Sequence, residues 1–165
     1  MGVNAIRIDE RLIHGQVATL WQGVWNCNRI IVIDTKSAED PILKSVLRIA
    51  CPGSVNLSVL TADKAAANLA SGKYGSERIT IVTKTPSNLV TLLNNSFKFD
   101  CEVTVGNMSN GEGKKRVTNN ICVTKDDIAD FHKLADDGCR LVKQLVPSES
   151  ASDFMPLLKA AEEAE

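Results

Sequence analysis

The hydrophobic positions in the first half of the chain follow two alternating spacings. Apolar, β-branched runs typical of strands lie at residues 6–8, 29–34, 55–60 and 79–83. Between them, apolar residues recur every three or four positions, as on one face of a helix. The first of these helical segments carries Val17, Leu20, Trp21 and Val24. This alternation of strands and helices predicts a doubly wound, largely parallel α/β sheet.

Capping residues mark where the later helices begin. Asp40-Pro41, Thr61 and Thr85-Pro86 each precede a helical apolar pattern. The helix after Asp40 carries an apolar stripe of Ile42, Leu43, Val46, Leu47 and Ala50. Gly72 is a stop signal for the helix that follows Thr61.

The second half of the chain departs from regular alternation. A strand at residues 102–106 is followed by a polar, glycine-bearing loop at 107–115 and an extended stretch at 117–123. Thr124-Lys-Asp-Asp127 resembles a capping box, and its helix is expected to end at Gly138. A last strand at 140–146 and a last helix at 151–165, interrupted near Pro156, complete one domain over residues 1–165.

Composition narrows the class of protein. The 165 residues are 44% hydrophobic and carry a net charge of −1, which gives no sign of nonspecific binding to nucleic acid or to an anionic membrane. No run reaches the ~18 to 20 apolar residues of a membrane helix, so direct insertion is not expected. The five cysteines form no C-x-x-C or Cys/His cluster. This pattern predicts neither a metal site nor a disulfide framework and favours a reducing, cytoplasmic setting.

Candidate chemistry gathers in one stretch, residues 6–17. His14 lies where the first strand hands over to the first helix, with Arg11 before it and Gly15 behind it. In an α/β sheet, ligands are usually bound at this edge, where the first amides of a helix have no backbone partner. The other histidine, His132, is interpreted as a surface residue of an amphipathic helix. A purely structural role at a helix start stays open for His14.

The residues around His14 are suited to phosphoryl transfer. A neutral imidazole, with a pKa of about 6.5, is a nucleophile that can carry a phosphoryl group. Arg11 could bind that group bidentately, and the amides of Gly15 and Gln16 could add donors. Asp9 could hold the second imidazole nitrogen, or could simply favour the helix dipole. Arg7, between two isoleucines, is interpreted as a strand residue paired with a carboxylate.

The loop at 107–115 invites comparison with a nucleotide-binding loop. Glu112 stands where a P-loop needs lysine, and an extended segment follows instead of a helix, so ATP binding is disfavoured. The absence of Gly-x-Ser-x-Gly likewise disfavours an α/β-hydrolase. The loop is either simply solvated or borders the His14 site. Four residues at strand ends are proposed as that border: Asp34, Lys84, Gly106 and Asn107.

Several motifs resemble one protein family over nearly the whole chain. Arg7-Ile-Asp-Glu-Arg-Leu-Ile-His-Gly-Gln-Val17, with Trp21 beyond it, is similar to the signature of the mannose/fructose/sorbose-family IIB components of the bacterial sugar phosphotransferase system. Three further segments resemble the family: Gly72 to Arg78, Val105 to Lys115, and Val123 to Leu134. Residues 34–37 lack the asparagine-acid pair usual in the family, and residues 151–165 have no counterpart in it.

The resemblance implies a phosphocarrier enzyme with an open sheet of about seven mostly parallel strands. His14 would accept phosphate from the IIA component, charged from phosphoenolpyruvate through HPr, and pass it to a sugar imported by the membrane IIC and IID components. Arg11 would bind the phosphoryl group, and Asp9 would orient the imidazole of His14. The family serves mannose, fructose, sorbose and amino sugars. The resemblance also implies a homodimer and association with the membrane through the permease, and it implies no cofactor. The alternative function is a regulatory module of the same fold that docks a phosphorylated partner without transferring the phosphoryl group.

Overall fold

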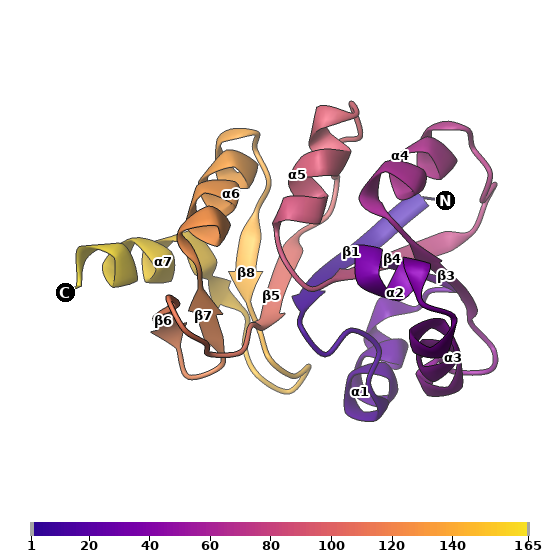
Figure 1. Cartoon of the computed structure of the whole chain (residues 1–165), viewed down its shortest axis with the longest axis horizontal. Helices are drawn as coiled ribbons and strands as arrows, with labels where there is room; N and C mark the ends of the chain where they lie inside the picture. The colour runs from indigo at the N-terminus through magenta and orange to yellow at the C-terminus, as the bar shows by residue number, and fades with distance from the viewer. Residues whose placement is uncertain (1, 165) are drawn as a thin grey trace.

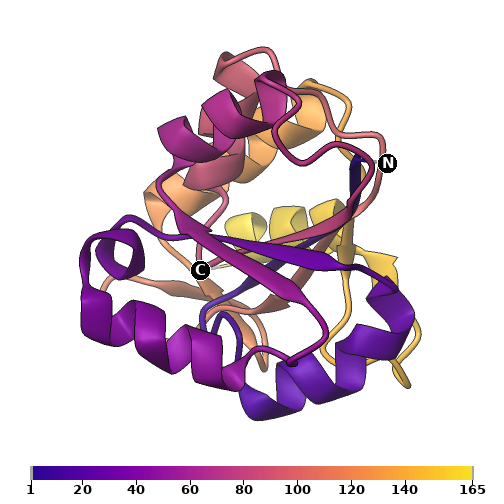
Figure 2. The same cartoon turned by 90° about the vertical axis from the view of Figure 1, so that its right-hand side faces the viewer.

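An open seven-stranded sheet forms the centre of the molecule (Figures 1 and 2). The computed structural model describes residues 2–164, except for the side chain of Gln16. Along the sheet the order is β3-β2-β4-β1-β5-β8-β9. The first six of these strands are parallel, and β9 pairs antiparallel with β8. The strands are β1 (Gly2–Asp9), β2 (Arg29–Ile33), β3 (Asn56–Leu60), β4 (Arg78–Thr83), β5 (Val103–Asn107), β8 (Leu141–Lys143) and β9 (Ser152–Asp153).

Helices cover both faces of the sheet, as Figure 2 shows. One face carries α1 (Gly15–Trp25), α2 (Thr35–Glu39) and α3 (Pro41–Ala50). The other face carries α4 (Ala62–Ala70), α5 (Ser87–Asn94), α6 (Lys125–Asp136) and α7 (Phe154–Glu163). The predicted fold class, an open and mostly parallel α/β sheet, is therefore confirmed.

The sheet separates two hydrophobic cores, because successive strand residues point to opposite faces. In β2, Ile31 and Ile33 belong to the core under α4 and α5, whereas Ile30 and Val32 belong to the core under α1 and α3. Both faces of the strand are buried, which explains its unbroken β-branched run.

A separate two-stranded hairpin replaces the extended stretch expected at residues 117–123. It consists of β6 (Lys115–Thr118) and β7 (Ile121–Val123), paired antiparallel. Met108, just beyond β5, forms a bridge to Ile121. The hairpin therefore continues directly from the end of β5.

Several boundaries differ from those expected. The 140–146 strand is regular only over β8, and residues 152 and 153 form the short edge strand β9 before α7 begins. Pro156 does not interrupt α7, because it lies in the first turn, where a backbone N–H has no helical partner. The short helix α2, capped by Asp34, was not predicted. The expected end of the last helix, Glu165, lies outside the described residues.

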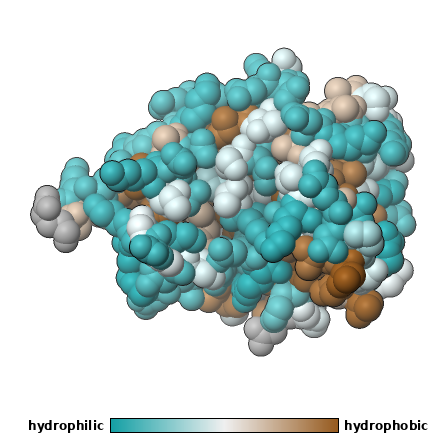
Figure 3. Space-filling view, in the orientation of Figure 1, coloured by the Kyte–Doolittle hydropathy of each residue, from teal (hydrophilic) through white to brown (hydrophobic). Residues whose placement is uncertain are grey.

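The helices α1 and α3 expose several apolar side chains, among them members of the stripes that the sequence pattern had identified on each helix. Val17 and Trp21 are buried as expected, but Leu20 and Val24 are 47% and 58% exposed. In α1 the buried stripe is completed by Ala18 and Trp25 instead. On α3 the exposed side chains are Ile42, Val46 and Ile49. Figure 3 shows a brown patch in the region where Figure 1 places α1 and α3. No helix within residues 2–164 is long and apolar enough to cross a membrane.

Candidate functional site

The predicted site residues lie at the carboxyl edge of the sheet, around the end of β1. The chain leaves β1 towards α1 on one face, whereas it leaves the neighbouring strand β5 towards α6 on the other face. Adjacent strands whose connections diverge in this way form a crevice, where ligands of open α/β sheets bind. Residues 10–14 form the loop on the β1 side of that crevice.

The loop is pinned by two buried side chains and one backbone turn. Leu12 and Ile13 are only 4% and 5% exposed and belong to the core beneath α1. The N–H of Leu12 donates to the carbonyl of Asp9 at 3.0 Å, and Leu12 adopts a φ of 57°, a left-handed conformation that is uncommon for leucine. Since Leu12 and Ile13 point into the core, the next residue, His14, is carried to the surface.

His14 is the N-cap of α1. Its backbone is extended, with φ −130° and ψ 150°, and its carbonyl accepts a hydrogen bond from the N–H of Ala18 at 2.8 Å. Within the described part of the chain, its exposed imidazole makes no capping bond. The first amides of α1, at Gly15 and Gln16, have no partner in the helix and point outward. The imidazole is therefore accessible beside a partial positive charge.

Asp9 and Arg11 form a tight pair directly before His14. The Nε of Arg11 donates to Oδ1 of Asp9 at 2.9 Å, its Nη2 donates to Oδ2 at 2.8 Å, and its backbone N–H also donates to Oδ1. Asp9 is completely buried, whereas the side chain of Arg11 is 31% exposed. The hydrogen bonds to Asp9 raise the pKa of Arg11, so its guanidinium is always charged.

The structure does not bring Asp9 and His14 together as the sequence had predicted. Both carboxylate oxygens of Asp9 accept from arginines, and no hydrogen bond to His14 is formed among the described residues. A carboxylate buried beneath two guanidiniums binds them in preference to a surface imidazole, since charge-assisted bonds are the stronger ones. The second arginine is Arg7, whose side chain is completely buried.

The residues proposed as a site border all lie at this edge, with different partners. Asp34 caps α2 and lies 3.8 Å from the amine of Lys84. The carbonyl of Asn107 accepts from the N–H of Glu10 at 2.9 Å, while its buried side-chain oxygen has no hydrogen-bond partner. Gly106 lies against Arg7. The structure thus places Lys84, Gly106 and Asn107 at the ends of β4 and β5, the strands next to β1, and Asp34 at the end of β2, one strand further away.

The glycine-bearing loop after β5 is tied to the His14 loop through Glu10. Its carboxylate accepts from the N–H of Ser109 at 2.7 Å and lies 3.8 Å from the amine of Lys114. Burial raises the pKa of Glu10, but the Ser109 bonds and the charges of Lys114 and Lys84 outweigh it and hold the pKa below its usual value. The loop at 107–115 therefore borders the site as a charged, fixed wall.

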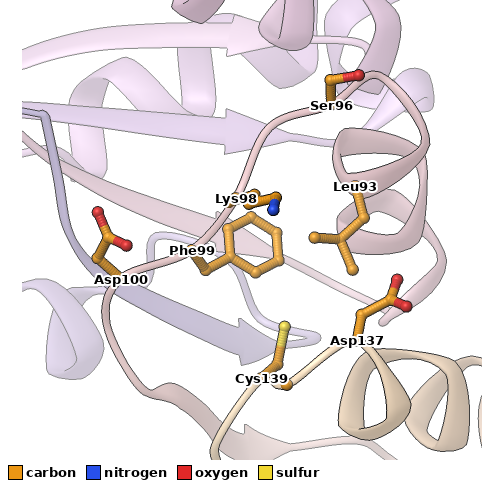
Figure 4. A pocket seen from close by; sticks show the side chains of 8 residues that line it. Leu93, Ser96, Lys98, Phe99, Asp100, Asp137 and Cys139 are labelled. Atoms are coloured by element: carbon orange, nitrogen blue, oxygen red, sulfur yellow. The ribbon is translucent and has the colours of Figure 1, made fainter.

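A cavity of about 380 Å³ lies at the opposite edge of the sheet (Figure 4). Its lining comes from the segments just before β5 and β8, at the amino ends of those strands: Leu93, Ser96, Lys98, Phe99, Asp100, Asp137, Gly138 and Cys139. Burial raises the pKa of the Cys139 thiol, which leaves little reactive thiolate at neutral pH. This cavity contains none of the predicted site residues. The described residues contain no group of three or more His, Cys, Asp and Glu side chains able to hold a metal ion.

An accessible imidazole at a helix N-terminus, three residues after an arginine fixed by a buried carboxylate, is suited to carrying a phosphoryl group. Comparisons with known proteins agree. Residues 3–165 match the family described as "PTS system sorbose subfamily IIB component". The match includes residues 151–165, so the expectation that these residues have no counterpart in the family was wrong. The chain is 31% identical over 159 residues to the "PTS system fructose-specific EIIB component" of Bacillus subtilis (strain 168), covering 96% of this chain and 97% of that protein.

Two further relatives extend the comparison. The "N-acetylgalactosamine-specific phosphotransferase enzyme IIB component 2" of Escherichia coli (strain K12) is 33% identical over 152 residues, covering 92% of this chain and 96% of that protein. The crystal structure of the IIBSor domain of the sorbose permease from Klebsiella pneumoniae has a TM-score of 0.92 and 29% identity, and covers 99% of each chain. Relatives named for three sugars thus have similar identities, which single out none of them.

The chain belongs to the sorbose-subfamily IIB components of the sugar phosphotransferase system. It is a phosphocarrier component and a protein-Npi-phosphohistidine–sugar phosphotransferase, as the resemblance had implied. Membership also implies its partners, a IIA component as phosphoryl donor and the IIC and IID components of a permease.

Reasoning from the sequence interpreted Arg7 correctly as a strand residue paired with a carboxylate, because it binds Asp9. It missed the backbone of residues 144 and 145, whose carbonyls accept hydrogen bonds from Arg7. No local pattern pointed to residues 144 and 145, which are brought to the site only by the pairing of β8 with β5.

Proposed function

We propose that His14 is the residue that carries the phosphoryl group. It would accept the group from the phosphorylated IIA component and transfer it to a hydroxyl of the sugar bound by the permease. The observation that supports this most directly is the position of His14, exposed at the N-cap of α1 and on the same short loop as Arg11. A donor protein can reach this imidazole without any rearrangement of the fold.

The transfer consists of two displacements at phosphorus. A ring nitrogen of neutral His14 gives its lone pair to phosphorus while the donor's own bond to phosphorus breaks, and the donor keeps that electron pair. The proton on the other ring nitrogen of His14 leaves to solvent. In the second step, a sugar hydroxyl oxygen attacks phosphorus and releases its proton as the nitrogen–phosphorus bond breaks. The electrons of that bond return to the ring, which takes up one proton from solvent, so that neutral His14 is restored.

Arg11 and the start of α1 are the proposed binding groups for the phosphoryl oxygens. A guanidinium has five N–H donors, and Asp9 occupies Nε and one hydrogen of Nη2. The two hydrogens of Nη1 thus remain available to a phosphoryl oxygen. The amides of Gly15 and Gln16 would contribute the helix N-terminus. Lys84 and the side chain of Asn107 would lie at the rim, where the lysine attracts the incoming dianion.

The association state and cellular setting of the chain are part of the same proposal. We infer that it acts in the cytoplasm and reaches the membrane through the permease, without inserting and without a nucleic-acid partner. A homodimer is supported by the apolar face of α1 and α3, where five aliphatic side chains are exposed: Leu20, Val24, Ile42, Val46 and Ile49. Sedimentation of an Ile42→Lys/Ile49→Lys variant should then give a monomer where the unmodified protein gives a dimer.

The experiment that tests the site uses labelled phosphoenolpyruvate with enzyme I, HPr and the cognate IIA. The unmodified chain and His132→Ala should both become labelled, whereas His14→Ala should not. His132 is a matched control, because it is also on the surface, 37% exposed, and only pairs with Glu162 at 2.9 Å. Labelling of His14→Ala at the normal level would reject the proposal.

A further inference from the structure

The side chain of Arg7 is the largest that the structure buries completely. A buried charge is costly unless it is paired and its donors are satisfied. The Nε of Arg7 donates to Oδ2 of Asp9 at 3.2 Å, and its Nη2 lies 3.1 Å from the same oxygen. Burial lowers the pKa of Arg7, and the carboxylate of Asp9 opposes that shift. An arginine buried at this cost is expected to have a role beyond packing in the strand.

The guanidinium of Arg7 joins segments that are far apart in the sequence. Its Nη1 donates to the carbonyl of Gln144 at 2.9 Å, and its Nη2 donates to the carbonyl of Leu145 at 2.8 Å. Its central carbon lies 4.6 Å from the ring centroid of Trp21 in α1. Arg7 therefore connects β1 both to α1 and to the segment that follows β8.

The backbone that receives Arg7 is itself fixed from the other side. The carboxylate of Glu149 accepts from the N–H of Leu145 at 2.6 Å and from the amine of Lys143 at 2.7 Å. The side chain of Gln144 donates to the carbonyl of Glu149 at 2.8 Å. The two carbonyls that accept from Arg7 are therefore held in place by contacts that do not involve the guanidinium.

Gly106 in β5 provides the space for this guanidinium. A Cβ at residue 106 would lie 2.1 Å from Nη2 and 2.3 Å from the central carbon of Arg7, closer than non-bonded atoms approach. Residue 106 has no positive φ that would call for glycine. The guanidinium of Arg7 thus gives the reason for a glycine in the middle of this edge.

We propose that Arg7 is a positioning residue for phosphoryl transfer, acting through Asp9 on Arg11. The inference rests on the proposed role of His14. Oδ2 of Asp9 is shared between Arg7 and Nη2 of Arg11, so Arg7 fixes the carboxylate that in turn sets the direction of the Arg11 guanidinium. The same contacts fix the backbone at Leu145, next to Val146. Leu145 and Val146 help to line a small cavity whose other lining residues are Arg11, Val17, Leu20 and Trp21. Arg7 itself touches neither the phosphoryl group nor the sugar.

The test measures labelling of His14 at increasing concentrations of phosphorylated IIA. Lysine keeps the charge of Arg7 but cannot bind Asp9 and two carbonyls in the same plane. For Arg7→Lys we expect kcat to fall ~10- to 100-fold, as for a misplacement of about 1 Å, while the half-saturating IIA concentration stays within about twofold. Gly106→Ala retains every charge and displaces the guanidinium, so it should likewise lower kcat and leave the half-saturating IIA concentration nearly unchanged.

Arg29→Lys is the matched control. Arg29 also pairs bidentately with a carboxylate, Glu77, at 2.7 and 3.1 Å, and its central carbon lies 4.7 Å from the ring centroid of Tyr74. It begins β2, at the opposite edge of the sheet. Arg29→Lys should lower the melting temperature and leave kcat unchanged, which separates positioning from general stability.

The outcomes separate this inference from the proposed function. A folded Arg7→Lys or Gly106→Ala protein with kcat within about twofold of the unmodified chain would overturn the positioning role. So would an equal loss of kcat in Arg29→Lys. If Arg7→Lys does not fold, Gly106→Ala decides the matter alone. Failure of the unmodified chain to label at His14 would instead reject the proposed function, whatever the Arg7 variants do.

Discussion

Arg7 and Arg11 flank Asp9 and bind the same carboxylate, but they lie in opposite surroundings. Arg7 is completely buried, and its donors are directed at Asp9 and at two backbone carbonyls. Arg11 is 31% exposed, and among the described residues its guanidinium is bound to Asp9 alone. The segment from Arg7 to His14 thus has a buried half, Arg7 and Asp9 at the end of β1, and an exposed half, Arg11 and His14 in the loop that follows.

This difference shows how a site can be rigid and still reactive. In the buried half, the charges are paired and the hydrogen-bond donors are satisfied within the protein. These residues can therefore fix the positions of their neighbours, but they have no free donor for a ligand. The exposed half keeps spare donors on Arg11 and an accessible imidazole on His14. We therefore expect changes in the buried half to lower both stability and rate, and changes in the exposed half to lower the rate with little loss of stability.

The largest effect on stability is expected from Asp9→Asn. The amide would leave the buried charge of Arg7 without its counter-ion, and breaking one partner of a buried pair costs about 3–5 kcal/mol. Urea unfolding of the purified variant measures this loss in free energy of unfolding. A loss below about 1 kcal/mol, as for a surface ion pair, would show that the two halves do not differ as described.

Arg11→Ala should reverse this balance. Asp9 keeps its bonds to Arg7, so the free energy of unfolding should fall by only about 1–2 kcal/mol. The rate of His14 labelling should fall ~100-fold, because a charged donor to the transferring group is lost. Stopped-flow or quench-flow labelling with phosphorylated IIA measures the rate. Normal labelling with a large loss of stability would make Arg11 a purely structural residue.

A smaller effect is expected from Glu149→Gln, through pH. Hydrogen bonds from Lys143 and Leu145 lower the pKa of Glu149 below its ordinary value of 4.5. The native carboxylate therefore binds a proton less readily than the unfolded one, so its stabilisation is present above about pH 4.5 and is lost as the pH falls through the lower native pKa. The variant should be less stable than the unmodified chain by up to about 1 kcal/mol at pH 7, and this difference should shrink towards pH 3. Urea unfolding at several pH values measures it, and a constant difference would contradict the assignment.

Much of the fold was predictable because it depends on local patterns. The β-branched run at residues 29–34 indicated a strand covered on both faces, and Asp40-Pro41 and Thr124 to Asp127 marked helix starts that the structure confirms. Apolar spacing was less reliable on α1 and α3. It identified the helices correctly, but Leu20 and Ile42, which belong to the apolar stripes, are exposed, because periodicity shows which residues share a side and not which of them meet the sheet.

The parallel sheet, the junction that carries His14 and the position of Arg11 could all be predicted from the sequence, because each follows from residues that are close together in the chain. The partners of Asp9, the contacts of Arg7 and the reason why residue 106 is glycine became visible only in the folded structure. Arg7 and Gln144 are 137 positions apart, and they meet because β5 pairs with β1 on one side and with β8 on the other. Such contacts leave no local pattern, because no spacing along the chain encodes the order in which strands pair.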